Sequence, residues 1–177
     1  MSTPSTGELK IESTDIQTAP GVQLSSEQKT LVGVVLDLFA GRPSLAKLQT
    51  WTDDATFADP ITEAKGRDRY QAQWYGLQTA FSEIERKSHS VTSSGNPIEM
   101  DLVTRYKIKG IGKETTINSK INIFTNEAGK ITKVEDKWDG KLPDSSIANA
   151  FRHLNAVSVP KMVSVPKNAE EDAARGN

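Results

Sequence analysis

Four consecutive runs with β-strand character occupy the second half of the sequence and constrain the fold most strongly. They are Ile84–Thr92, Glu99–Lys109, Glu114–Thr125 and Lys130–Trp138. The connections between them, SSGNP, GIGK and NEAG, are short and each contains glycine, as hairpin loops often do. Because hairpins join antiparallel neighbours, this half predicts a four-stranded antiparallel meander. Helical patterns come before it, so the chain predicts an α+β fold.

The pattern of residues 25–41 predicts the first helix. Ser25 can cap its start and Gln28 can complete a capping box, while Gly41 follows its end. Pro43 predicts the start of a second, short helix, because proline suits a first helical position.

A third helix is predicted over residues 66–81, after two short extended runs, ATFAD and ITEAK, on either side of Pro60. Its aromatic and aliphatic residues recur at spacings of four, three and four, so they share one helix face. They are Tyr70, Trp74, Leu77 and Phe81.

The segments outside residues 25–140 have a different composition. Residues 1–24 are rich in Ser, Thr, Pro and Gly, which predicts a disordered arm. Residues 141–177 predict one short helix in LPDSSIANAFRHL and then an extended or disordered tail, in which VSVPK occurs twice. Residues 1–24 and 168–177 show no periodic apolar content, so we expect both of these stretches to be dispensable for the fold.

Composition excludes several classes of function. The formal net charge is −1, which gives no reason to expect nucleic acid or a membrane as a partner. The chain has no cysteine, and its two histidines, His89 and His153, are far apart, so we expect no metal and no other cofactor. No secretory signal and no apolar stretch of about 20 residues is visible, so we expect a cytoplasmic protein.

The stretch WTDDATFADP, the Gly66–Arg67 pair after it and the final hairpin IFTNEAGKITKVEDKW carry a resemblance to a known superfamily. Residues 25–140 resemble the nuclear transport factor 2-like superfamily, which includes ketosteroid isomerase and the SnoaL-type polyketide cyclases. The resemblance implies a cone in which a strongly bent, mostly antiparallel sheet wraps around the N-terminal helices and leaves a pocket open at one end. Many members are homodimers across the convex face of the sheet.

The resemblance also implies site residues. Asp59 falls on the position of the ketosteroid isomerase general base, while the oxyanion-hole positions fall on Val35 and Lys120, so steroid isomerisation itself is not expected. Lys120 replaces a neutral acid with a cation that can stabilise an enolate. With Asp136 on the last strand, these residues give the predicted catalytic set of Asp59, Lys120 and Asp136. The candidates for ligand binding are Tyr70, Trp74, His89, Tyr106, Asn122 and Trp138.

Two alternatives stay open. Asp59 precedes Pro60, and a small polar residue before proline also occurs as a plain turn former. In TINSKINIF, isoleucines alternate with Asn118, Lys120 and Asn122. Simple alternation places the isoleucines in the core and Lys120 in water, whereas the resemblance places Lys120 in the pocket and the isoleucines under a second subunit.

The predicted function is therefore that of a small-molecule pocket protein. As an enzyme it is expected to be an isomerase, cyclase or dehydratase that uses an Asp general base on an apolar or polyketide-like molecule, without a cofactor. The alternative is a non-catalytic module of the same fold that binds an apolar ligand or dimerises.

Overall fold

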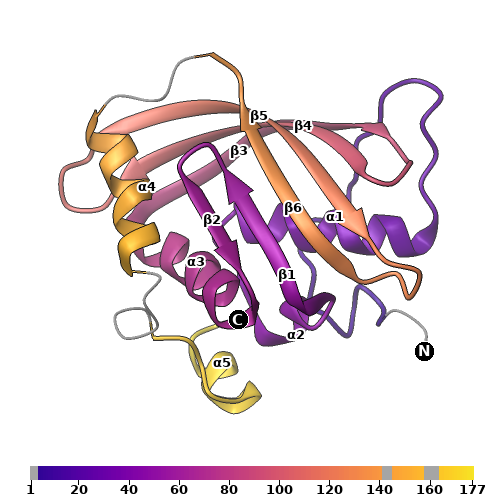
Figure 1. Ribbon diagram of the computed structural model, residues 1–177, viewed down its shortest axis with the longest axis horizontal. Helices are drawn as coiled ribbons and strands as arrows, with labels where there is room; N and C mark the ends of the chain where they lie inside the picture. Colours follow the sequence, from indigo (N-terminus) through magenta and orange to yellow (C-terminus); the bar gives the residue numbers. More distant parts are fainter. Residues whose placement is uncertain (1–3, 141–144, 158–163) are drawn as a thin grey trace.

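The computed structural model describes residues 4–140, 145–157 and 164–177, and in it a bent six-stranded sheet wraps around helices on its concave face (Figure 1). The strands are β1 (Trp51–Asp59), β2 (Thr62–Lys65), β3 (Phe81–Ser93), β4 (Ile98–Ile108), β5 (Glu114–Thr125) and β6 (Ile131–Trp138). Their order is β2-β1-β6-β5-β4-β3, with β1 and β6 parallel and every other neighbouring pair antiparallel. The predicted α+β fold and its meander are confirmed, and the sheet stays open rather than closing into a barrel.

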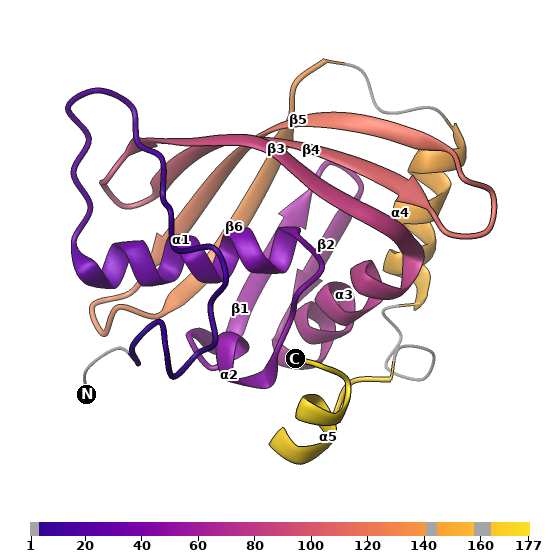
Figure 2. The ribbon, with the colours of Figure 1, turned by 180° about the vertical axis from the view of Figure 1, so that it is seen from behind.

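The helices pack mainly on the concave face of this sheet and at one end of it (Figures 1 and 2). They are α1 (Ser26–Phe39), α2 (Leu45–Leu48), α3 (Arg67–Ala80), α4 (Ser145–Val157) and α5 (Ala169–Ala174). The predicted capping box at the start of α1 is confirmed. Ser25 Oγ accepts from the Gln28 N–H at 3.1 Å, and Gln28 Oε1 accepts from the Ser25 N–H at 3.0 Å.

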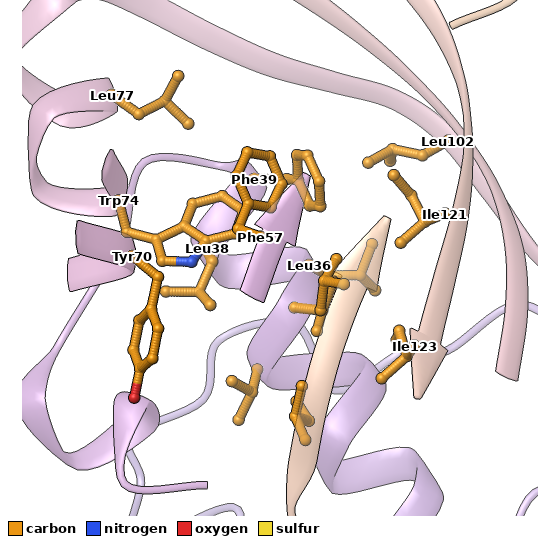
Figure 3. Close-up of a cluster of buried hydrophobic side chains, with 14 of the residues drawn as sticks. Leu36, Leu38, Phe39, Phe57, Tyr70, Trp74, Leu77, Leu102, Ile121 and Ile123 are labelled. Atoms are coloured by element: carbon orange, nitrogen blue, oxygen red, sulfur yellow. The ribbon is translucent and has the colours of Figure 1, made fainter. Parts of the chain in front are cut away.

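The isoleucines of β5 face the concave side of the sheet, where Ile121 and Ile123 lie opposite Leu36 of α1 (Figure 3). Both isoleucines are completely buried, whereas Lys120 is exposed. The placement of Lys120 in the pocket is therefore wrong, because successive side chains of a strand point to opposite faces. With the isoleucines in the core, the argument for a homodimer through them is lost, and the homodimer stays an untested prediction.

The N-terminal segment packs on α1, which corrects the expectation of a disordered arm for residues 4–24. Leu9 and Ile11 are buried in the core, and Thr18 pairs with Val91 at the edge of β3. Gly33, in the middle of α1, makes this approach possible. A Cβ at this position would lie 2.8 Å from the carbonyl oxygen of Ser13, so a larger residue would push the segment away.

Asp37 of α1 holds this segment in place. Its carboxylate accepts hydrogen bonds from the N–H groups of Glu12 and Ser13 at 2.9 and 3.0 Å, and it lies 3.1 Å from the ammonium of Lys47. Burial by itself raises the pKa of Asp37, but the bonds from Ser13 and Glu12 and the charge of Lys47 outweigh burial and leave the pKa below its ordinary value.

The C-terminal helix α5 is also attached to the fold, through Asp172. This buried carboxylate accepts from the Tyr75 hydroxyl at 2.8 Å and from the Leu45 N–H at 2.7 Å. The expectation of a disordered end is corrected for residues 169–174, and the contacts at both ends argue against their being dispensable. Residues 158–163, with most of the first VSVPK copy, lie outside the described residues.

Within the described residues, no helix has the length and apolar character needed to cross a membrane.

Asp37→Asn is expected to lower the free energy of unfolding by about 3–5 kcal/mol, because it leaves the buried Lys47 ammonium without its counter-charge. In the double variant Asp37→Asn, Lys47→Met the loss should be smaller than the sum of the two single losses. Urea unfolding measures all three variants. A loss of about 1 kcal/mol or less for Asp37→Asn, the value of an exposed ion pair, would contradict this account.

The same interaction predicts a pH dependence. The pKa of Asp37 is lower in the folded protein than in the unfolded chain. The stabilisation that Asp37 supplies is therefore fully present above the unfolded pKa of about 3.9. It is lost as the pH falls through the folded pKa. The stability difference between the wild type and Asp37→Asn should therefore shrink below about pH 4.

Candidate active site

A small cavity lies between α3 and the concave face of the sheet. It is lined by Phe39, Phe57, Asp59, Gln73, Trp74, Leu77, Tyr106, Asp136 and Phe151. Its volume is about 10 Å³, which is room for about one water molecule. The wall is mostly aromatic and aliphatic, with four polar side chains set into it.

The parallel pairing of β1 with β6 brings two of these polar side chains together. Ala58 lies opposite Glu135 in the register, so the next residues along the two strands, Asp59 and Asp136, are neighbours at the end of the pair. Both side chains line the cavity.

Asp59 ends β1 directly before Pro60. Its Oδ1 accepts a hydrogen bond from the Ile61 N–H at 2.9 Å, which closes a tight turn. Burial raises the pKa of Asp59 to about 6, although the bond from Ile61 favours the charged form. The residue thus both shapes the turn and presents a carboxyl group to the cavity.

Asp136 is more deeply buried, with 6% of its surface exposed. Its Oδ2 accepts from the indole N–H of Trp138 at 2.9 Å. Its Oδ1 has no hydrogen-bond partner in the described part of the chain. Burial raises the pKa of Asp136 to about 7, and the charge of Asp59 adds to the increase.

Tyr106 and Gln73 complete the polar part of the wall. Burial raises the pKa of Tyr106, and the neighbouring Asp136 raises it further, so the phenol keeps its proton at neutral pH. The Gln73 side-chain oxygen is buried and has no hydrogen-bond partner among the described residues. Two of the four polar side chains of the wall, Asp136 and Gln73, therefore carry a buried oxygen whose hydrogen bond a bound molecule can supply.

The electrostatics of this wall suit proton transfer. Two neighbouring carboxyl groups with pKa values of about 6 and about 7 repel one another when both are charged, so they titrate as a pair. Between these values, the dominant state has one carboxylate and one protonated acid. A base and an acid are then present in the same cavity near neutral pH.

Three aromatic rings of the wall, those of Phe39, Phe57 and Trp74, pack on one another from α1, β1 and α3 (Figure 3). The Trp74 ring lies 5.0 Å from Phe39 and 4.7 Å from Phe57, measured between centroids. Tyr70 is on the same helix but points away, and its hydroxyl donates to the Thr52 carbonyl at 3.1 Å (Figure 3). Tyr70 therefore belongs to the core and does not line the cavity.

Three other predicted site residues lie outside the cavity wall. Lys120 and Asn122 are on the convex face of the sheet, where Lys120 borders a shallow groove. His89 accepts a hydrogen bond from the Gln17 N–H at 3.0 Å and so binds the N-terminal segment, not a ligand. The assignment of these three residues to the pocket is wrong. The resemblance placed Lys120 and Asn122 on the concave face of the sheet, whereas they lie on the other face. For His89, the packing of the N-terminal segment was not expected.

Asp59, Asp136, Trp74 and Tyr106 do line the cavity, and their chemical roles stay predictions. Trp138 acts on the cavity indirectly, through its bond to Asp136. Sequence reasoning missed Gln73, although it is three residues after Tyr70 and four before Leu77, a spacing that places it on one helix face with them.

Other missed lining residues had weaker signals. Phe151 lies in α4, which the sequence analysis placed outside the domain of residues 25–140. In the described residues, no group of three or more His, Asp or Glu side chains could hold a metal ion.

Comparisons with known proteins agree with this fold. The family model of the SnoaL-like domain matches residues 36–134, more than half of the chain. A steroid delta-isomerase from Pseudomonas aeruginosa has a similar structure, with a TM-score of 0.57 and 13% identity, covering 80% of this chain and 97% of that one. The structure of a nuclear transport factor 2-like protein of unknown function from Exiguobacterium sp. 255-15 is also similar, with a TM-score of 0.52 and 19% identity. The match covers 63% of this chain and 99% of that one. No curated protein matches the sequence.

Asp136→Asn is expected to stabilise the protein by about 2 kcal/mol or more at pH 8, because it removes a charge that burial disfavours. A raised folded pKa means that stability falls as the pH rises from the unfolded value towards about 7, so the gain should be much smaller at pH 5. Urea unfolding at both pH values measures the gain. Asp101→Asn is the matched control, because Asp101 is exposed on the convex face. Equal effects of the two substitutions at pH 8 would contradict the burial of a charged Asp136.

Proposed function

The chain belongs to the SnoaL-like domain family, within the nuclear transport factor 2-like superfamily, and on that basis we propose that it is a cofactor-independent enzyme of the isomerase or cyclase kind. Its substrate would be a small apolar molecule with an enolisable carbonyl group. The observation that carries the proposal is the pair of carboxyl groups, Asp59 and Asp136, which line one mostly apolar cavity and have pKa values raised to about 6 and about 7.

Asp59 is the proposed general base. Its pKa of about 6 leaves it mainly charged at pH 7 while keeping it a stronger base than an ordinary carboxylate. It would take a proton from the carbon next to the carbonyl and return that proton to another carbon of the same molecule. The bond from the Ile61 N–H fixes the orientation of the carboxylate at the mouth of the turn.

Asp136 and Tyr106 are the proposed donors to the developing enolate oxygen. Protonated Asp136 can donate a hydrogen bond, and Tyr106 keeps its proton at neutral pH. Donors that are fixed in a water-poor site stabilise such an oxyanion strongly, and the loss of one typically costs about 10²–10³ in rate. In this proposal Asp136 takes the role that the sequence resemblance gave to Lys120.

The fold supports this class of reaction without identifying a substrate. The steroid delta-isomerase from Pseudomonas aeruginosa shares the fold, but its low identity of 13% transfers no activity. The mostly apolar wall also suits a second function, the binding of an apolar ligand without catalysis. Proton exchange on a bound ketone separates the two functions.

Asp59→Asn is expected to reduce proton exchange at the carbon next to the carbonyl of β-tetralone by about 10²–10⁴-fold, because it removes the base and keeps the size of the side chain. Exchange in D₂O, followed by proton NMR, measures this rate. The wild-type rate should rise with pH through about 6, as Asp59 loses its proton, and fall through about 7, as Asp136 loses its proton.

Lys120→Met is the control, since its side chain lies on the convex face and should leave the exchange rate unchanged. Equal exchange rates in the wild type and Asp59→Asn would refute the proposed base. No exchange in the wild type, with binding of the ketone retained, would favour the non-catalytic function.

A further inference from the structure

We propose that Gln73 is a positioning residue: together with Asp136 it holds one water molecule in the cavity, and this water passes protons between Asp59 and Asp136. The inference deepens the proposed function, because it adds a proton path between the proposed base and the proposed acid. It rests on that function for the roles of the two carboxyl groups, whereas the water site can be tested without a substrate.

The side chain of Gln73 is buried without a hydrogen bond to its oxygen. Gln73 is 3% exposed and lines the cavity, and its Oε1 has no partner among the described residues. Two tyrosines of the same helix differ from it: Tyr70 donates to the Thr52 carbonyl at 3.1 Å, and Tyr75 donates to Asp172 at 2.8 Å. A buried acceptor without a partner costs stability, so we expect a partner that is not part of the chain.

The size and the charge of the cavity identify that partner. The volume is about 10 Å³, which one water molecule fills, and a buried water forms about three hydrogen bonds with otherwise unpaired polar groups. Pockets for small organic ligands begin at about 300 Å³. No lysine or arginine is among the described residues that line the cavity, so an anion would have no counter-charge there. Water therefore fits this space better than an organic ligand or an anion.

The unpaired atoms of the wall match the two hydrogens of a water molecule. Gln73 Oε1 and the Oδ1 of charged Asp136 are both acceptors, and both residues line the cavity. The other oxygen of Asp136 already accepts from the indole N–H of Trp138, so Oδ1 is the oxygen left for the water. A water that donates to both acceptors can itself accept from the Tyr106 hydroxyl or from protonated Asp59, which line the same space.

This water gives the two carboxyl groups a path for proton exchange. The pair has two singly protonated forms, and the proposed reaction needs the one with charged Asp59 and protonated Asp136. The water converts the other form into this one, because Asp59 donates its proton to the water and the water passes one of its own hydrogens to Asp136. One O–H bond breaks at Asp59, one forms at Asp136, and the water is unchanged. Gln73 does not titrate, so its oxygen can hold the water before and after the transfer.

The first test is a high-resolution crystal structure of the wild type without substrate. It should show one density peak about 2.5–3.0 Å from both Gln73 Oε1 and Asp136 Oδ1, the range for a hydrogen bond between oxygen atoms. Gln73→Met removes the amide and keeps the length of the side chain, so the peak should be lost in this variant. The wild-type structure tests the water site even if the variant does not fold.

The second test is a carbon-13 NMR titration of the Asp59 and Asp136 carboxyl groups in the wild type and in Gln73→Met. Loss of the water removes a donor that favours the charged form, so the midpoint of Asp136 should rise by about one pH unit. Gln71→Met is the matched control, because Gln71 is on the same helix but does not line the cavity, and it should leave the midpoint unchanged.

The third test is proton exchange of β-tetralone. Gln73→Met should lower kcat about tenfold or more and leave KM unchanged, because the ketone still binds while the pair returns to its productive form more slowly.

The absence of the peak in the wild type, or a direct hydrogen bond between Gln73 and Asp136, would overturn the water site. Loss of the peak in Gln73→Met with an unchanged Asp136 midpoint would overturn the link between the water and the carboxyl groups. A wild-type protein that binds the water but does not exchange the ketone would support the water site and refute the proposed enzyme activity, so the two failures are distinguishable.

Discussion

The parallel pairing of β1 with β6 is the constraint on which the candidate site depends. It is the one parallel pair in the described sheet, and it brings Asp59 and Asp136 to the same end of two neighbouring strands. Two carboxyl groups in an apolar wall cannot both be charged at low cost: burial raises both pKa values, and the charge of Asp59 raises that of Asp136 further. The architecture of the sheet thereby produces an acid and a base at neutral pH.

The stability of this arrangement comes from elsewhere in the fold. Core isoleucines of β5 pack on α1, and the buried charge of Asp37 is matched by Lys47 and by backbone N–H groups of the N-terminal segment. One buried carboxylate is thus fully paired and keeps a lowered pKa, while two others in the cavity have few partners and raised pKa values. The cationic partner Lys47, rather than burial alone, separates the carboxylate with a lowered pKa from the two with raised pKa values.

Much of the fold could be predicted from local patterns. Glycine-containing connections marked the meander, and the alternation of β6 placed Asp136 inward, where the structure has it. The placement of Lys120 failed because it rested on an alignment by resemblance, and an error of one residue moves a strand side chain to the other face. The packing of the N-terminal segment and the role of Phe151 were not predictable locally, since both depend on contacts between segments far apart in sequence.

A carbon-13 NMR titration of the aspartate carboxyl carbons tests directly whether Asp59 and Asp136 form an acid–base pair in one cavity. We expect coupled midpoints near pH 6 and pH 7, and in Asp59→Asn a lower midpoint for Asp136, because the repelling charge is gone. Independent midpoints near the ordinary aspartate value of about 3.9 would contradict such a pair.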